Sequence, residues 1–442
     1  MSSRFFTRGV AAGVMLAVLH AGHAQSVDAL TLDQAEKLMQ QHNRELQAAR
    51  RALESARANV TIAAARPNPT LNFSISQINP SLGVGSGSYR DKTMDSTLRL
   101  DQVIERGERR ELRLATAKSL ESASAEDLSD TLRQQRLALH GAYYDLLFVQ
   151  DKTAISRDTA SLFGRTLEAA ELRLKAGDIA AADVSRIRVD ALRAANDARA
   201  AEAELRRAQL ALAYLIGAEA AAARLRATDA WPAGSGTEAA SVSEDMIDRR
   251  PDVRAARQRV DAAVAARDLA RSLRTRDVSV GASYDHYPTS STNTLGTGNS
   301  YGVYMSIPLF ANYRYEGEIE RAEVDYSAAQ DGLGRMRALA RGELERALSD
   351  LRAATDRVRR YDDALLAEAK RAADAAEFAY KNGAIGVMDL LDARRTLRAT
   401  QVDAVSARNE FARALAAWRA GLVDEQSDAA DMAWDAGKKG AK

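Results

Sequence analysis

Residues 344–383 have the sequence LERALSDLRAATDRVRRYDDALLAEAKRAADAAEFAYKNG, in which small and aliphatic residues return at helical spacing. One row recurs every seven positions, at Leu344, Leu351, Val358, Leu365 and Ala372. A companion row follows three positions on, at Ala347, Ala354, Tyr361 and Ala375. Such a heptad seam predicts a helix that packs along another helix.

This segment belongs to a longer proline-free region. The region begins at Glu316 and continues to Tyr380, and about 65 helical residues would span roughly 100 Å at 1.5 Å per residue. Lys381, Asn382 and Gly383 form a helix-stop signal. Helical spacing resumes after Ile385 and ends near Trp418. The sequence therefore predicts a hairpin of two long helices with a tight tip.

A second hairpin of the same design is expected earlier in the chain, from Glu108 to Lys175 and, after a break at residues 176–178, on to Ile216. Two pairs lie 206 positions apart, Gly177 with Gly383 and Asp183 with Asp389. Four pairs lie 207 apart: Leu46/Val253, Arg50/Arg257, Leu100/Ile307 and Glu111/Glu318. This steady offset indicates an internal duplication.

Composition limits the class of protein. A chain of 442 residues would ordinarily form two or three domains, but the duplication favours one elongated unit. Charged residues make up 28% and aromatic residues only 5%, which suits long helices with seams of small residues. The net charge of +1 gives no bulk attraction to nucleic acid. The lack of cysteine excludes disulfides, thiolate metal sites and a cysteine nucleophile.

The first 24 residues have the order of features of a secretory signal peptide. A basic start with Arg4 and Arg8 precedes the apolar run 9–19, and small residues precede Gln25. Because no cysteine follows, we expect no lipid attachment at a cysteine. No other segment has the length and apolarity of a transmembrane helix.

Four segments alternate between apolar and polar residues and predict strands. They lie at residues 70–76 and 94–101 in the first repeat, and at 278–285 and 300–307 in the second, each pair separated by a Gly- and Ser-rich loop. Their length suits a tilted membrane strand, although a small soluble sheet is the alternative. Since four strands cannot close a barrel, the membrane interpretation requires several chains.

The remaining segments complete the domain plan. A helix is expected from a cap at Thr31 to about Ala65, before the two prolines at 67 and 69. The first repeat would then occupy residues 25–217 and the second 246–423. Residues 218–245 are expected to form a linker with little regular structure, and 424–442 a flexible tail.

Several local motifs accompany this order of elements: RPNPTL at 66–71, SIPLF at 306–310, and the tips AGDIAAADV at 176–184 and NGAIGVMDLLDA at 382–393. On these grounds the chain resembles the TolC-like outer-membrane efflux family from Leu30 to Val423. RPNP and VIERGERRELRLATAK at 103–118 are most similar to the heavy-metal, CzcC-like branch.

The resemblance implies a mainly α fold with a β-barrel contribution. Three chains would form a trimer with one twelve-stranded outer-membrane barrel and a helical tunnel that extends into the periplasm. The tunnel would meet a periplasmic adaptor protein bound to an inner-membrane RND pump. Such proteins are passive ducts in outer-membrane lipid, so neither enzymatic activity nor a cofactor is implied.

The resemblance also implies roles for individual residues. Asp389 and Asp392 match positions that form carboxylate rings at the periplasmic entrance, and such rings favour cations. Acidic residues in the first turns of a helix can equally serve as caps that complement its dipole. Both interpretations stay open here.

Tyr380 and Asp183 resemble a pair that bonds neighbouring coils and keeps the entrance closed, although Tyr380 could equally be a packed coiled-coil aromatic. Ile385 and Ala182 depart from the family pattern, so a second latch cannot form from those positions. The tips themselves, at Gly177, Ile179, Gly383 and Ile385, would contact the adaptor, or would simply cap their helices.

No metal site is expected, because His42, His140 and His286 are widely separated. The sequence thus predicts an exit duct of a tripartite efflux system, with divalent heavy-metal cations as the expected cargo. Drug or solvent efflux and type I secretion are alternatives within the same architecture. A periplasmic coiled-coil adaptor is an alternative of a different class, but adaptors carry one hairpin flanked by compact β domains.

Overall fold

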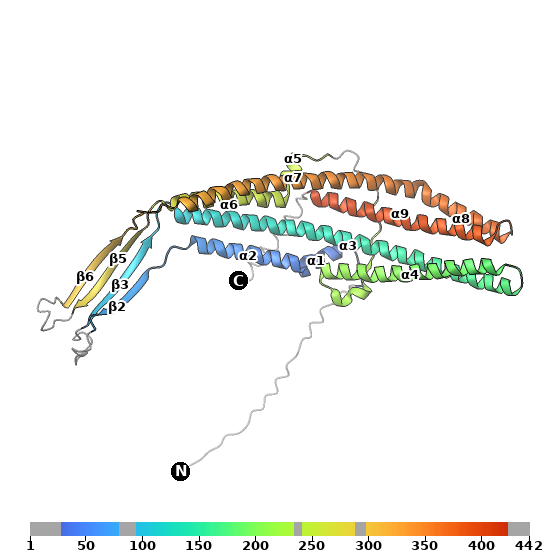
Figure 1. Ribbon diagram of the computed structural model, residues 1–442, viewed down its shortest axis with the longest axis horizontal. Helices are drawn as coiled ribbons and strands as arrows, with labels where there is room; N and C mark the ends of the chain where they lie inside the picture. Colours follow the sequence, from blue (N-terminus) through green and yellow to red (C-terminus); the bar gives the residue numbers. More distant parts are fainter. Residues whose placement is uncertain (1–27, 79–93, 234–240, 288–297, 423–442) are drawn as a thin grey trace, which may run out of the picture.

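The computed structural model describes residues 28–78, 94–233, 241–287 and 298–422 of the chain. The molecule is elongated, with a sheet at one end and the tips of two helical hairpins at the other (Figure 1). The predicted signal peptide, the predicted tail and most of the two loops within the strand pairs lie outside the described residues.

The sheet at the end of the molecule is antiparallel, with the order β2 (Thr70–Ser76), β3 (Asp95–Ile104), β5 (Val278–Tyr287) and β6 (Gly298–Ser306). Cross-strand partners share a face. Leu71, Leu100, Ala282 and Val303 are aligned in this way across all four strands. The predicted alternation is confirmed, and the pairing of β3 with β5 joins the two repeats.

The opposite face of the sheet carries a polar network. The Asp285 carboxylate accepts hydrogen bonds from Thr97 at 2.6 Å and from Ser283 at 2.8 Å. Glycine makes room for large neighbours on this face: a Cβ at Gly281 would lie 2.2 Å from Asp101 Oδ1. The sheet is therefore amphipathic, as a strand set with one lipid-facing side requires.

The long helices form two hairpins that lie alongside each other (Figure 1). The first contains α3 (Arg109–Lys175) and α4 (Ala181–Ile216). The second contains α7 (Glu316–Arg360), a π-helical turn (Tyr361–Leu365), α8 (Leu366–Lys381) and α9 (Val387–Gly421). Both predicted hairpins are confirmed. Among the described residues, none of the helices combines the length and the apolarity needed to cross a bilayer.

The π-helical turn corrects part of the predicted heptad seam. Leu344, Leu351 and Val358 are buried as expected, but Leu365 and Ala372 are exposed. Ala373 is the buried residue of α8 instead. A π turn holds one residue more than an α turn, so it moves the buried position along the chain by one.

The expected single helix between Thr31 and Ala65 is wrong. The structure has α1 (Leu32–His42) and α2 (Arg44–Ala64) with a break at Asn43. The Asn43 side chain accepts a hydrogen bond from the Leu46 N–H at 3.0 Å and so begins a new helix. In the second repeat, α5 (Glu244–Arg249) and α6 (Pro251–Ser272) are divided in the same way at Arg250.

The linker between the repeats has more structure than expected. It contains a 3₁₀ helix (Glu219–Arg224) and the short strand β4 (Arg226–Ala227), which pairs in parallel with β1 (Ala29–Leu30). The buried Tyr143 hydroxyl fastens this strand pair to α3, since it donates to the Leu30 carbonyl at 2.9 Å and accepts from two linker amides. Burial raises the pKa of Tyr143 to about 12.

Candidate functional site at the hairpin tips

Both hairpins turn in the same way at their tips. Gly177 and Gly383 have φ values of +83° and +73°, the left-handed backbone that glycine adopts without strain. Beyond them, the Asp178 N–H bonds to the Arg173 carbonyl at 2.9 Å, and the Ala384 N–H bonds to the Ala379 carbonyl at 2.8 Å. The tips therefore have the predicted capping geometry.

The isoleucines at the two tips differ in their surroundings. Ile179 packs against a buried cluster, named here the tip cluster, whose members are Phe163, Ala170, Val184, Ile187, Ala191, Ala194 and Leu391. Ile385 is half-buried at the end of the second hairpin. Because Leu391 comes from α9 and the other members from α3 and α4, the tip cluster joins the two hairpins.

Ion pairs reinforce this contact between the hairpins. Arg395 of α9 pairs with Asp190 of α4, whose side chain is only 9% exposed. Arg398 pairs with Asp197 at 2.9 Å. These four residues were not predicted from the sequence, but α4 gives a signal for two of them. Asp183, Asp190 and Asp197 are spaced by seven residues, so they lie on one face of the helix.

The two candidate pore residues lie in the first turns of α9. Asp389 is exposed and accepts a hydrogen bond from the Gly386 N–H at 3.3 Å, which is the capping contact that sequence reasoning gave as the alternative. Asp392 is 78% exposed and has a loose contact with Arg395 at 3.8 Å. Both carboxylates are thus near each other at the tip and accessible to water.

The two candidate gate residues do not contact each other in this chain. The Tyr380 hydroxyl accepts a hydrogen bond from Arg173 Nη1 at 3.2 Å, which joins α8 to α3. Asp183 is half-buried at the start of α4, and across the described parts of the chain it has no hydrogen bond to Tyr380. The structure therefore brings Tyr380 to the other hairpin, but to a partner that was not predicted.

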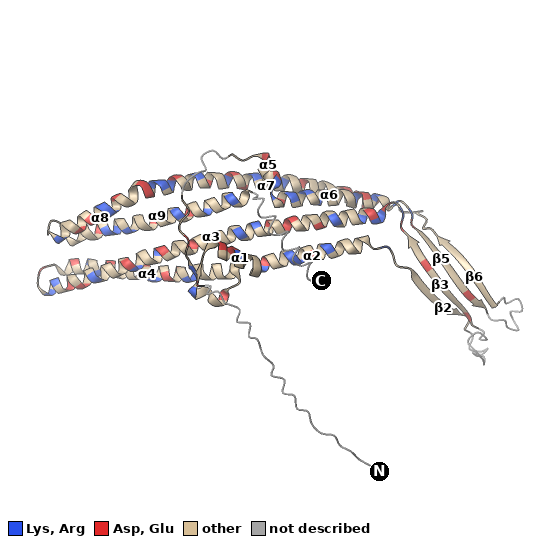
Figure 2. Cartoon of the chain, turned by 180° about the vertical axis from the view of Figure 1, so that it is seen from behind, with Lys and Arg blue, Asp and Glu red and all other residues tan. Residues whose placement is uncertain are grey.

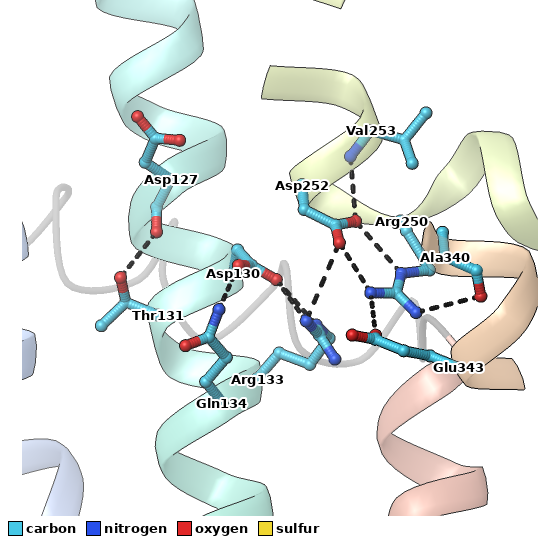
Figure 3. A network of polar contacts seen from close by, with 10 residues as sticks. All are labelled: Asp127, Asp130, Thr131, Arg133, Gln134, Arg250, Asp252, Val253, Ala340 and Glu343. Carbon is cyan, nitrogen blue, oxygen red and sulfur yellow. Dashed lines mark hydrogen bonds and ion pairs between the residues drawn. The ribbon is translucent and has the colours of Figure 1, made fainter. Parts of the chain in front are cut away.

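A second polar site, also missed from the sequence, lies where α5 and α6 meet (Figure 3). Arg250 is 1% exposed, and its guanidinium bonds to Asp252 at 2.6 Å and to Glu343 of α7 at 2.7 Å. Burial disfavours its charge, but these two carboxylates hold the pKa of Arg250 above its ordinary value. Arg133 of α3 lies 4.0 Å from Asp252, so four helices, α3, α5, α6 and α7, meet here.

His140 and His286, both within the described residues, have ordinary polar partners. His140 Nε2 lies 2.5 Å from Glu36 Oε1, and His286 Nδ1 lies 2.8 Å from Asn299. Within the same described residues, no group of three or more His, Asp or Glu side chains is arranged to hold a metal ion.

Comparison with known proteins places this geometry in a family. The profile described as "Outer membrane efflux protein" matches residues 37–218 and 242–422. The cobalt-zinc-cadmium resistance protein CzcC of Cupriavidus metallidurans is 26% identical over 372 residues, which cover 83% of this chain and 84% of that protein.

Two solved structures show the same fold. A membrane protein from Pseudomonas aeruginosa has a TM-score of 0.75 at 20% identity, and covers 89% of this chain and 93% of its own. The channel CusC has a TM-score of 0.72 at 18% identity, with 89% and 92% covered. The predicted fold class of helical hairpins with a β-barrel contribution is confirmed. Proteins of this family are channels and not enzymes. This chain belongs to the outer membrane efflux protein family.

Proposed function

We propose that this channel is the outer-membrane exit duct of a tripartite RND-type efflux system that exports divalent heavy-metal cations. One observation carries the choice of cargo: the similarity to the cobalt-zinc-cadmium resistance protein CzcC extends over 83% of the chain and therefore includes both repeats. The ions are cargo that crosses the duct and need no resident ligand set.

The open edges of the sheet support a homotrimer. Both outer strands, β2 and β6, have one edge without a partner among the described residues, and every residue of β2 is exposed. Unpaired backbone groups cannot face lipid, so the edges require further strands. Three copies of the four strands would give one twelve-stranded barrel with the apolar face toward lipid.

The exposed carboxylates at the second tip support a cation-selective entrance. In a trimer, Asp389 and Asp392 would contribute six carboxylates to one ring. Such a ring concentrates divalent cations and repels anions. The contact of Asp389 with the Gly386 N–H leaves one of its oxygens free for this role.

The surfaces of the tips support docking of a periplasmic adaptor, which would in turn bind the inner-membrane pump. Leu172 and Phe378, each five residues before a tip glycine, are 66% and 71% exposed. Exposed apolar side chains beside Gly177 and Gly383 suit packing against a helical hairpin of a partner. The Tyr380 hydroxyl lies at a contact between the two hairpins, and Asp183 is half-buried at the start of α4; we place the gate at these two residues.

Growth of a deletion strain tests the cargo. The strain is exposed to graded zinc, cobalt, cadmium, nickel and copper, and in parallel to dyes, detergents and antibiotics, with a plasmid-borne wild type as the control. Selective sensitivity to metals that the plasmid restores is the expected result. Sensitivity to organic compounds with normal metal tolerance would contradict the proposed cargo and leave the duct in place.

A matched pair of variants tests the pore residues. Asp389→Asn combined with Asp392→Asn should lower the ratio of cation to anion permeability in planar bilayers and weaken metal tolerance. Asp403→Asn is the control, because Asp403 is an exposed carboxylate on the same helix, α9, further from the tip. Equal selectivity of the double variant and the control would exclude the proposed ring.

A further inference from the structure

Two arginines continue the apolar face of the sheet beyond the end of its ladder. The last partners in the β3–β5 ladder are Ile104 and Val278, which lie on the apolar face. Arg106 and Arg276 are each two residues further, just outside the strands, and continued alternation would place them on the same face and opposite each other. The close approach of the next pair supports this register, since a Cβ at Gly107 would lie 2.9 Å from Thr275.

Neither guanidinium is neutralised by the chain. Arg106 and Arg276 are exposed, and within the part of the chain that the structure describes neither side chain forms an ion pair. The nearby carboxylates are taken by other arginines: Asp277 binds Arg109 at 2.6 Å, and Glu105 binds Arg113 at 2.7 Å. Like charges directly opposite each other are unfavourable, so this pair is suited to an anion between them.

Apolar side chains lie beside the two arginines, either in contact with them or close to them in the sequence. Arg276 lies over the Phe310 ring, with 5.4 Å between its guanidinium carbon and the ring centroid. Ile104 and Leu309 are 48% and 79% exposed. The strands themselves carry few charged residues, whereas the helices that begin here carry many (Figure 2). The arginines therefore lie at the boundary between an apolar band and a charged region.

This boundary faces the periplasmic side of the outer membrane, because the long helices leave the sheet at this end (Figure 1). The membrane leaflet on that side consists of phospholipids. A headgroup phosphate between two guanidiniums and an acyl chain along Ile104 would match both the charge and the apolar surface. Since β3 and β5 are the inner strands of the sheet, the site is complete within one chain.

We propose that Arg106 and Arg276 form a binding site for the headgroup of an anionic phospholipid of the periplasmic leaflet. The site would hold the barrel at a defined depth in the membrane. This inference depends on the outer-membrane location of the family and is independent of the proposed metal cargo.

Native mass spectrometry of the purified full-length protein in detergent tests the proposal, with phosphatidylglycerol as the probe and phosphatidylcholine for comparison. Phosphatidylglycerol should bind more tightly than phosphatidylcholine. In the double variant R106Q/R276Q, the dissociation constant for phosphatidylglycerol should rise by about tenfold or more. The single variant R106Q should show a smaller loss, and it leaves the Arg276–Phe310 contact intact. Arg186→Gln is the control, since Arg186 is exposed on α4 far from the sheet.

Three results would overturn the proposal: equal binding of the two lipids, unchanged binding by the double variant, or displacement of the lipid by millimolar inorganic phosphate. The last result would indicate a general anion site. The assay measures lipid on purified protein, so a wrong assignment of the cargo would leave its outcome unchanged.

Discussion

The two repeats break their short helices at equivalent positions, but they do so with different chemistry. Asn43 and Arg250 are 207 residues apart, the offset of the duplication, and both are buried. Asn43 caps α2 and donates at 3.1 Å both to Gln135 and to the Leu215 carbonyl. Arg250 has no capping side-chain bond; Pro251 begins α6, and two carboxylates neutralise the guanidinium. The duplication has kept the backbone break and exchanged a neutral network for a charged one.

This difference makes the second repeat more sensitive to the loss of one partner. Asp252→Ala would leave the Arg250 charge buried with Glu343 alone, and removal of one member of a buried ion pair costs about 3 kcal/mol. We expect a large fall in the unfolding temperature followed by circular dichroism. Asp245→Ala is the control, because Asp245 belongs to an exposed pair with Arg249. Equal effects of the two substitutions would contradict the distinction.

The neutral junction at Asn43 should lose less stability on substitution than the charged junction at Arg250. Asn43→Ala removes a helix cap and should cost about 1–2 kcal/mol. Thr31→Ala removes the cap of α1, whose hydrogen bonds are exposed, and is the matched control. The loss for Asn43 should exceed that for Thr31, because Asn43 also satisfies Gln135 and the Leu215 carbonyl. If Asn43→Ala were more damaging than Asp252→Ala, the comparison between the repeats would be reversed.

The repeats have also diverged at α4 and α9, the second helices of their hairpins. The first supplies a row of acidic residues on α4, and the second supplies Arg395 and Arg398 on α9. Arg395→Gln would leave the buried Asp190 unpaired, at a cost of about 1–2 kcal/mol. Amide hydrogen exchange near Leu391 should then become about tenfold faster. Exchange at the same amides should stay unchanged in Arg321→Gln, whose side chain is 84% exposed.

The smallest effect concerns Glu36 and His140, a hydrogen-bonded pair that only the first repeat has. Burial alone would raise the pKa of Glu36, but the hydrogen bond to His140 and the nearby Arg136 hold that pKa below its ordinary value. The equivalent positions of the second repeat, 207 residues on, are Ser243 and Ala347.

A lowered carboxyl pKa contributes stability above the unfolded-state pKa, and this contribution is lost as the pH falls through the folded-state pKa. Glu36→Gln should therefore cost about 1 kcal/mol at pH 7, because the pair is partly solvated. The difference from the wild type should shrink as the pH falls through the folded-state pKa of Glu36, in unfolding experiments from neutral to acidic pH. A difference that persists at low pH would assign the effect to packing.

The features predicted from the sequence are those with a local signal. Alternation placed the four strands, and Gly177 and Gly383 placed both tips. The break at Asn43 was missed because no proline or glycine marks it; Asn43 caps α2 locally, and its side chain also has partners 92 and 172 residues away. The turn at Tyr361–Leu365 has no such marker either. The predicted buried positions of the heptad seam beyond it were therefore wrong by one residue.

At the tips, the sequence indicated which turns matter but not how the hairpins meet. The acidic row on α4 was visible, whereas its partners on α9 depend on how two segments about 200 residues apart are placed side by side. Arg250 was missed for the same reason, since its partner Glu343 is 93 residues distant. A pattern predicts the face of a helix that is charged, but only the packing of helices decides which charges are paired.

The pairing of β3 with β5 has a consequence for the order of folding. The first hairpin needs only residues 109–216, and its contacts are local, so it can form while the rest of the chain is still emerging. The sheet needs strands that are 188 residues apart at Thr97 and Asp285, and loop closure makes such pairings slow. Insertion of the sheet into the membrane is therefore expected to follow formation of the first hairpin.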